Sequence, residues 1–451
     1  MSNLKYILSA LLLTATTLLL GSCDDFLDIT PTGKVIAKTG EEYRELLGYE
    51  YKYFPTDRGL TMLRSDELAM SPAYTSSLDY DTYFDLWRWN DDNPSTTTTY
   101  YGWRRYYHAI YIANYIIKHQ SEITKATTDE VNQLVGESYM MRAYCHFLLC
   151  NLYAEPYTQV DPDTTRGVPL SMEANVDQVQ SCSSVADVYK QVLADCDEAE
   201  KYLNVDTWET GKNYRFNKLS AECLKARAYL YMGQWQQALT AAQAVIKAHP
   251  YLENLNTSNT LPNSYASAEN ILALEQNITA TYATIGRPSA SLMSSYLTGD
   301  MRRTKFYKRV TSSSYTLTKG GSETYSSSFR SAEFYLTAAE AAARLGERET
   351  SEAMLDTLLK NRYTPTVYLQ RQQAIAAMSN DELINEILTE RYRELAFEGH
   401  RWFDLRRTTE PAITKTYKGT SYTLQQGDSR YTLRFPSEAV EANPAIEKWD
   451  K

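Results

Sequence analysis

One helix-turn-helix unit, residues 227–250, constrains the fold more than any other part of this 451-residue chain. Gly233 allows a tight turn between two helices, because glycine adopts left-handed backbone conformations without steric cost. After it, Ala238, Ala241 and Ala244 give the second helix a face of small side chains that lets the two helices approach closely. A proline then ends the unit. Such a pair cannot bury its apolar face alone, so further pairs must stack against it.

A second unit of the same design spans residues 334–360, with Gly346 at its turn. Lys247 and Lys360 each lie 14 residues after the turn glycine of their unit, which indicates a repeat of tetratricopeptide type. Further candidate pairs are residues 99–120 with 128–150 and residues 130–153 with 184–203. The predicted fold class is therefore mainly α, a tetratricopeptide-like helical-pair solenoid of about four pairs, with large irregular loop insertions and minor β in the second half.

Apolar periodicity predicts the remaining organisation of the chain. The expected helices span residues 41–53, 99–120, 128–153, 184–203, 218–232, 234–248, 329–345, 349–362 and 379–398. Two stretches, near 55–95 and 254–328, are irregular in pattern, and residues 416–433 alternate as short strands do. We expect a single domain over residues 41–451 with these two insertions, and long loops on a rigid scaffold are where function usually resides.

The N-terminus has the pattern of a bacterial lipoprotein signal. After Lys5, residues 6–20 form a largely apolar stretch of 15 residues, too short for a membrane span of about 20. Small residues then lead to Cys23, whose thiol can carry a diacylglycerol. We predict a signal peptide over residues 1–22 and a lipidated, extended leader over 23–40; an ordinary cleaved signal peptide is the alternative. Acyl chains would then anchor the mature chain to a membrane that it does not cross.

The charge balance excludes some classes of partner. The formal net charge is −10, and it becomes −11 once residues 1–22 are removed with Lys5. An acidic chain is a poor ligand for nucleic acid and for anionic lipid surfaces, so the lipid itself must be the membrane anchor. Besides Cys23, five cysteines remain, an odd number that cannot be fully paired, and we expect no essential disulfide. They are Cys145, Cys150, Cys182, Cys196 and Cys223.

The aromatic composition favours a surface that recognises ligands. The chain has 37 Tyr and 7 Trp against only 11 Phe. Tyrosine and tryptophan combine an apolar face with a polar edge, which suits interfaces and sugars, whereas phenylalanine would serve equally well to fill a core. Most single tyrosines in such a chain still line helix packing seams.

The most distinctive segment is residues 390–407, in which Glu390, Glu394 and Glu398 recur every four residues among arginines. Arg391 lies on the apolar face of its helix and must be paired if buried, with Glu394 as the nearest partner, and Gly399 is expected to end the helix. One interpretation makes Glu394, Glu398 and Asp404 the paired carboxylates of a glycosidase. We favour a buried ion-pair network that clamps the last helix to the body. Its expected members are Arg391, Glu394, Glu398, Arg401 and Asp404.

This segment resembles the C-terminal motif of the SusD/RagB family, the surface lipoproteins of Bacteroidetes nutrient-uptake systems. Other matching segments are residues 23–27, 65–68, 114–117, 136–144, 167–170, 195–203, 431–436 and 443–444. Each segment is weak alone, but their number and order are specific. The chain departs from the family at Phe435-Pro436-Ser437, where the usual run is apolar-Pro-apolar-Pro.

The resemblance implies a helical body of four tetratricopeptide-like pairs with an irregular, ligand-facing half. It also implies a role in the outer membrane, facing the cell exterior, where the protein covers a SusC-like TonB-dependent transporter and captures glycan for it. The alternatives are a peptide-capturing uptake lipoprotein of RagB type, a repeat scaffold without ligand, and a glycosidase. The residues themselves contain no His-Glu-x-x-His or Gly-x-Ser-x-Gly pattern, and the five histidines are scattered, so we expect neither an enzyme nor a metal or nucleotide cofactor.

In the family the binding rings come from irregular regions, and both insertions of this chain carry suitable residues. The candidate ligand-binding residues are Tyr74, Tyr80, Tyr83, Trp87, Trp89, Tyr282 and Tyr296, with Tyr315 and Tyr325 nearby and Asp66 to hold hydroxyls. Each has a structural alternative: Asp66 could cap the next helix, and the two tryptophans could pack against Trp103 and Tyr107.

Overall fold

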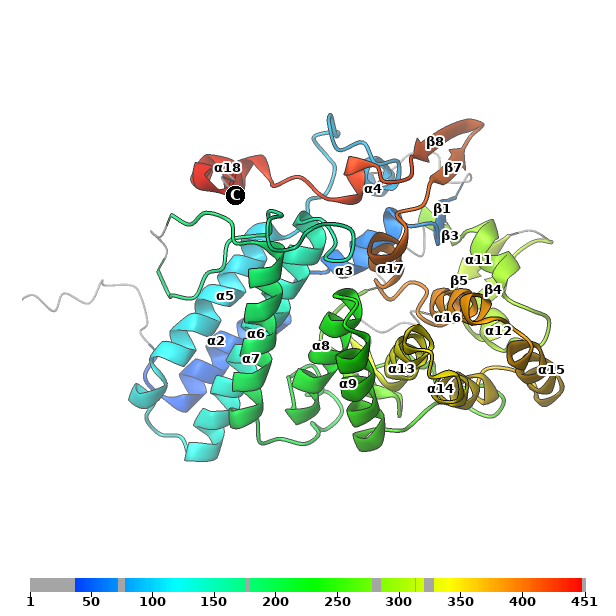
Figure 1. The fold of residues 1–451 in the computed structure, drawn as a ribbon. Coiled ribbons are helices and arrows are strands. Elements are labelled where there is room, and N and C mark those ends of the chain that lie inside the picture. The colour runs from blue at the N-terminus through cyan, green and yellow to red at the C-terminus, as the bar shows by residue number, and fades with distance from the viewer. Residues whose placement is uncertain are drawn as a thin grey trace, which may run out of the picture.

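In the part of the chain that the structure describes, ten helices have twelve or more residues, and they form a row that runs across Figure 1. The computed structural model describes residues 37–71, 78–175, 179–277, 285–312, 314–319 and 328–447. The long helices of the row are α2 (Gly40–Lys52), α5 (Trp103–Lys118), α6 (Thr128–Tyr153), α7 (Val185–Tyr202), α8 (Lys218–Tyr231), α9 (Trp235–Ala248), α13 (Ser331–Leu345), α14 (Arg348–Lys360), α15 (Pro365–Ala376) and α16 (Asn380–Glu394).

Successive helices of the row pack on one another from α5 to α9, and α9 packs on α13, which packs on α14 and α16. Of the three small residues predicted to allow this approach, Ala238 and Ala241 are buried on α9, whereas Ala244 is exposed and the prediction is wrong for it. Gly346 ends α13 in the left-handed conformation (φ 79°), and Gly233 turns the chain between α8 and α9 (φ 69°). The mainly helical, paired architecture predicted from the sequence is thereby confirmed.

Helix starts follow local capping rules. Thr39, Thr127 and Ser379 each cap a helix, and each is joined to the glutamate three residues later in a reciprocal capping box. The predicted end of the last long helix is wrong, since α16 stops at Glu394, and Gly399 lies beyond it with φ 72°. A Cβ at Gly399 would lie 2.5 Å from the Arg58 carbonyl oxygen, so this glycine is needed for a close approach.

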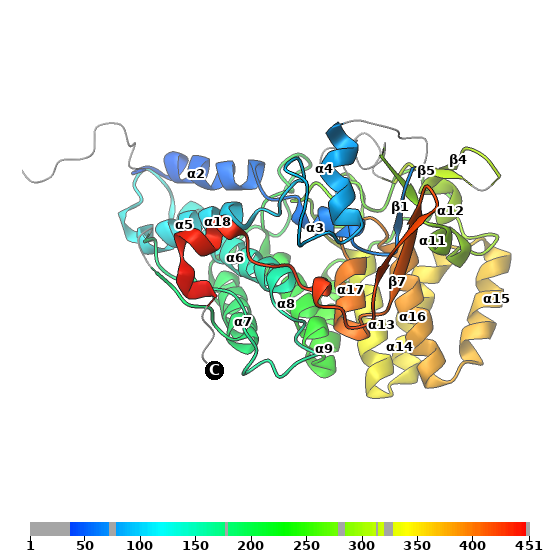
Figure 2. The same ribbon diagram turned by 90° about the horizontal axis from the view of Figure 1, so that it is seen from above.

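Most of the shorter elements labelled in Figures 1 and 2 lie toward the right of the view, whereas α18 lies at the left, beside α5. The short helices are α3 (Asp57–Leu60), α4 (Leu78–Trp87), α11 (Ala290–Ser295), α12 (Arg302–Lys305), α17 (Arg401–Thr408) and α18 (Ser437–Ala442). The strands are β1 (Leu68–Met70), β2 (Asn270–Leu272), β3 (Gly286–Pro288), β4 (Tyr307–Arg309), β5 (Tyr315–Leu317), β6 (Phe329–Arg330), β7 (Ile413–Tyr417) and β8 (Thr420–Leu424).

The strands form two-stranded antiparallel sheets, β1–β3, β2–β6, β4–β5 and β7–β8. In β1–β3, Leu68 pairs with Pro288 and Met70 with Gly286, so this sheet joins the first irregular stretch to the second. The β7–β8 hairpin accounts for part of the alternation expected over residues 416–433. Within the described ranges, no helix is long and apolar enough to span a membrane.

A pair of glycine variants tests the packing of the row. A Cβ at Gly136 on α6 would lie 2.8 Å from the backbone nitrogen of Leu203, whereas one at Gly48 on α2 would meet nothing within 4 Å. Gly136→Ala should therefore lower the free energy of unfolding by about 1–3 kcal/mol through overpacking. Gly48→Ala should raise it by up to about 1 kcal/mol, because alanine is the better helix former. Urea unfolding measures both, and equal effects of the two variants would contradict the close contact.

Candidate functional site

A buried group of ion pairs surrounds Glu394, the last residue of α16. Its carboxylate accepts hydrogen bonds from Arg302 at 3.0 Å, from Arg330 at 2.8 Å, and from Arg362 at 2.8 and 2.9 Å. All four side chains are buried. Three guanidinium groups around one carboxylate leave surplus positive charge, and further buried carboxylates offset it. These belong to Glu269, Asp300, Glu390 and Glu398.

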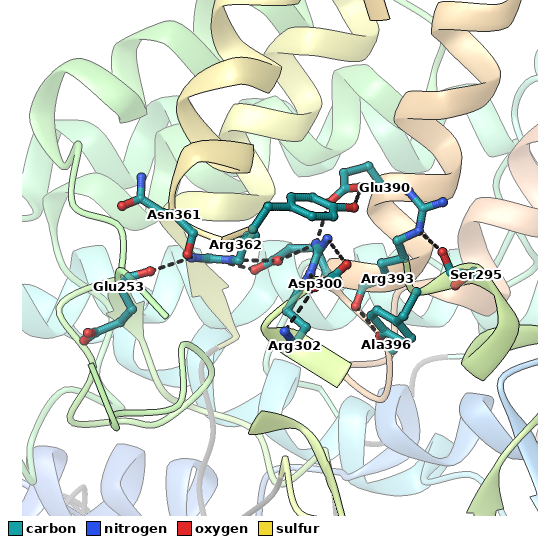
Figure 3. Close-up of polar contacts among 12 residues, drawn as sticks. Glu253, Ser295, Asp300, Arg302, Asn361, Arg362, Glu390, Arg393 and Ala396 are labelled. Carbon is teal, nitrogen blue, oxygen red and sulfur yellow. Dashed lines mark hydrogen bonds and ion pairs between the residues drawn. The ribbon is translucent and has the colours of Figure 1, made fainter. Parts of the chain in front are cut away.

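The cations reach this network from different segments (Figure 3). Arg302 belongs to α12, and Arg362 follows α14 and also donates to the Glu253 carbonyl at 2.6 Å. Arg393 of α16 donates to the carbonyl of Ser295, the last residue of α11, at 2.8 Å. The network therefore fastens the helical row to the second irregular stretch.

The expected pairing of Arg391 with Glu394 is wrong. Arg391 donates to Asp404 at 3.1 Å, and Asp404 also accepts from Arg407 at 2.8 Å. Arg407 in turn forms two hydrogen bonds of 2.7 Å with Glu340 of α13. Because α16 ends at Glu394, the chain turns back and α17 carries Asp404 to Arg391, whereas Glu394 faces the cations of the neighbouring loops.

The three carboxylates considered for glycoside hydrolysis are held ionised. Arginine guanidinium groups lower the pKa of Glu394 and Asp404, and Arg330 with Lys319 lowers that of Glu398, in each case against the opposing effect of burial. A glycosidase needs one carboxyl with a raised pKa to act as general acid. These side chains instead carry fixed charge within the scaffold. Among the residues that the structure describes, no three His, Cys, Asp or Glu side chains form a group that could hold a metal ion.

A second polar cluster, half open to solvent, lies at the end of β1. Asp66 forms two hydrogen bonds of 2.8 Å with the Arg401 guanidinium, and the two side chains are 24% and 19% exposed. Arg401 lies 4.1 Å above the ring centre of Tyr392, whose hydroxyl donates to the Asp66 carbonyl at 3.2 Å. The hydroxyls of Ser289 and Ser291 lie 3.5 and 3.4 Å from that of Tyr392. Carboxylate, guanidinium and hydroxyls together can both accept and donate hydrogen bonds.

The other end of the β1–β3 sheet leads to two of the candidate tyrosines. The Ser71 backbone N–H donates to the Ile285 carbonyl at 2.8 Å, which extends the pairing of β1 and β3 by one residue. Tyr74 follows Ser71 by three residues, and Tyr282 precedes Ile285 by three. Tyr74, Tyr282 and Tyr325, and the side chain of Tyr80 in α4, lie outside the described residues.

The prediction that Trp87 and Trp89 bind ligand is wrong. Both indoles are buried, and each N–H donates to a backbone carbonyl at 2.9 Å, Trp87 to Leu68 and Trp89 to Arg64. Trp87 ends α4 and Trp89 has a φ of 57°, so the chain turns and both rings point inward. They enclose the ammonium of Lys415, which lies 4.1 Å from the Trp89 ring centre. The alternative partners Trp103 and Tyr107 pack elsewhere, against each other.

Tyr296 is likewise no surface residue, so its predicted role is wrong. It is 3% exposed, and its hydroxyl donates to the Arg393 carbonyl at 2.7 Å. Tyr83 on α4 and Tyr315 on β5 are half-buried and keep part of their surface open. Tyr392, Ser289 and Ser291 were not expected in a site. Helix periodicity in the sequence could have indicated Tyr392, because adjacent residues of a helix point in different directions and its neighbour Arg391 faces inward.

Two family models match the chain in succession. One, described as the SusD family, matches residues 245–448, and the other, described as starch-binding associating with outer membrane, matches residues 36–230. A SusD-like protein of Formosa agariphila is 30% identical over 166 residues, which cover 36% of this chain and 29% of that protein. The match thus spans less than a third of the relative's length.

Solved structures share the fold over most of the chain. A SusD superfamily protein of Bacteroides thetaiotaomicron is 23% identical with a TM-score of 0.75, covering 92% of this chain and 100% of that one. One of Bacteroides fragilis is 22% identical with a TM-score of 0.74, again over 92% and 100%. A laminarin-binding SusD-like protein is 20% identical with a TM-score of 0.62, over 82% and 92%. At these identities the likeness shows the fold.

Removal of the central carboxylate should destabilise the protein strongly. Glu394→Gln leaves the guanidinium groups of Arg302, Arg330 and Arg362 buried with less compensating charge, which should lower the free energy of unfolding by about 3–5 kcal/mol. Glu45→Gln, at an exposed position of α2, is the control and should change it by less than about 0.5 kcal/mol. Urea unfolding of both variants tests this, and a loss at Glu394 no larger than the control would contradict it.

The same carboxylates should make stability fall in acid. Because the pKa values of Glu394, Glu398 and Asp404 are lowered in the folded protein, the unfolded chain binds protons first as the pH falls. Their contribution is complete above the unfolded-state pKa of about 4 and is lost as the pH falls from there through the folded-state values. The urea concentration at half-unfolding, measured at a series of pH values, should therefore decrease once the pH is below about 4. The drop should be smaller in Glu394→Gln; equal slopes would show that this carboxyl is not the source.

Proposed function

Because the chain belongs to the SusD/RagB family, we propose that it is a lipid-anchored protein that captures glycan at the outer membrane and delivers it to a SusC-like TonB-dependent transporter. The lipid would be carried by Cys23, at the end of the predicted signal peptide. A solved relative of the same fold is described as laminarin binding, and the family model over residues 36–230 is described as starch-binding, which supports glycan as the cargo.

The observation that carries the proposal is the half-open cluster of Asp66, Arg401 and the serines at the β1–β3 sheet. The β1–β3 sheet joins the two irregular stretches, so residues that are far apart in the sequence can contact one ligand. The polar side chains would bind sugar hydroxyls, with Asp66 as acceptor and Arg401 as donor. Tyr392 contributes its hydroxyl only, because the Arg401 guanidinium covers its ring.

Aromatic contacts would come from the opposite end of the same sheet. Tyr74 and Tyr282 are three residues along the chain from Ser71 and Ile285, whose hydrogen bond extends the sheet. We propose these two tyrosines, with Tyr80 and Tyr83 of α4, as the rings that stack on sugar faces. Each stack contributes about 0.5–1.5 kcal/mol, so a few stacks and hydrogen bonds give millimolar to micromolar affinity. Weak capture suits a protein that passes its cargo on.

Affinity electrophoresis of the purified protein against a panel of polysaccharides tests the proposal. One glycan should retard the protein, and Tyr74→Ala, Tyr282→Ala and Asp66→Asn should each weaken that retardation by about two- to tenfold. Tyr251→Ala removes an exposed tyrosine that follows α9 and should leave binding unchanged.

The circular dichroism spectrum of each variant should match that of the parent, so that a loss of binding is not a loss of folding. Retardation by a glycan that survives all three site variants would move the site elsewhere. Absence of binding to every glycan in the panel, together with binding of peptides, would overturn glycan as the cargo.

A further inference from the structure

A cavity of about 600 Å³ opens beneath the β4–β5 hairpin, in the second irregular stretch. We call it the hairpin pocket. It is lined by the loop before α12, by the outer side of α12 and by both strands of the hairpin. Its lining residues include Leu297, Asp300, Arg303, Arg309, Tyr315 and Thr318. The volume lies within the range of about 300–1,000 Å³ found for small-molecule sites.

The charge of this pocket is opposite to that of the chain. Arg303, Lys308 and Arg309 line it, in a protein whose formal net charge is −10. Among the described residues, none of the three forms an ion pair: Arg303 donates to the Tyr315 hydroxyl at 3.1 Å, and Arg309 donates to the carbonyls of hairpin-turn residues. Most other arginines of the fold have carboxylate partners, so this group of cations is unusual.

The one carboxylate in the lining does not neutralise them. Asp300 is 3% exposed and forms hydrogen bonds of 2.9 and 2.7 Å with the guanidinium of Arg302, which lies behind the pocket in the buried ion-pair network. Its charge is thus already matched by a different arginine. The positive charges of Arg303, Lys308 and Arg309 remain available to a ligand.

The same pocket offers a ring and a hydroxyl. Tyr315 lies directly across the hairpin from Arg309, and cross-strand neighbours point to the same face of the sheet. Its half-buried ring can contact the apolar face of a sugar. Its hydroxyl accepts from Arg303, which leaves its O–H as a donor. Guanidinium forks match the planar oxygens of a carboxylate and also bind sulfate and phosphate oxygens well.

We propose that the hairpin pocket binds an anionic sugar residue, through its carboxylate or its sulfate group, and that the glycan captured by this protein is therefore acidic. Arg303 and Arg309 hold the anion, Lys308 adds to the positive field, and Tyr315 contacts the ring. This inference rests on the proposed function, since it names the class of glycan, but it concerns a cavity apart from the Asp66 cluster.

The experiment compares three glycans with the purified protein by affinity electrophoresis: polygalacturonate for carboxylate, a sulfated galactan for sulfate, and laminarin as the neutral reference. One acidic glycan should bind, and the Arg303→Gln/Arg309→Gln double variant should weaken that binding at least about tenfold. Added salt should weaken binding of the parent more than that of the double variant. Arg303→Lys keeps the charge without the fork and should retain part of the affinity.

Arg104→Gln, at an exposed position of α5, is the matched control and should bind as the parent does. Binding of polygalacturonate would identify carboxylate as the recognised group, and binding of the sulfated galactan would identify sulfate. Unchanged binding of an acidic glycan in the double variant, or binding of laminarin alone, overturns this inference and leaves the proposed function standing. Failure of both acidic glycans to bind overturns this inference, whereas the proposed function is overturned only when every glycan of the wider panel fails and peptides bind.

Discussion

Burial of the Glu394 carboxylate among three arginines is the constraint on which the rest of this structure depends. Removing a charge from water is costly, and the cost is offset only when opposite charges are held at hydrogen-bond distance with good geometry. The partners are Arg302 of α12, Arg330 of β6 and Arg362, which follows α14. The network therefore exists only when the helical row and the second irregular stretch are both in their native positions. That requirement gives the irregular half a fixed place on the row.

The segment that supplies this network also supplies the open cluster. Glu394 and Glu398 point into the core, whereas Arg401, three residues after Glu398, reaches Asp66 at the surface. Gly399 makes the change of direction possible, because its left-handed backbone lets the chain pass against Arg58. The positions of the buried anions and of the surface cation are thus coupled through a few residues of backbone. A shift of α16 would move the proposed binding surface with it.

How far the sequence predicts this structure depends on the range of the interactions. Helix periodicity and capping are local, and α6 has the predicted bounds, Thr128–Tyr153. The helix α15 was not expected, although Pro365 at its first turn is a known start signal. Partner choice is not local: Arg391 and Asp404 meet because the chain reverses between them. Trp87 and Trp89 have the polar ring edge that also suits a binding site, but their N–H groups donate to the carbonyls of Leu68 and Arg64. No pattern in the sequence around the two tryptophans reveals these partners. The roles of Tyr74 and Tyr282 remain predictions.

The β1–β3 sheet has a consequence for the order in which the molecule becomes native. Like the two strands, Arg58 and Glu275 join the two irregular stretches, and they are hydrogen-bonded although 217 residues separate them in sequence. Closing a chain segment of that length costs conformational entropy before any contact rewards it, whereas neighbouring helices meet through short connections. Once the helices between the two strands have assembled, less flexible chain separates the strands, and the entropic cost of joining them is lower. We therefore expect the proposed binding surface to form late, when contacts of high sequence separation join it to helices that have already assembled.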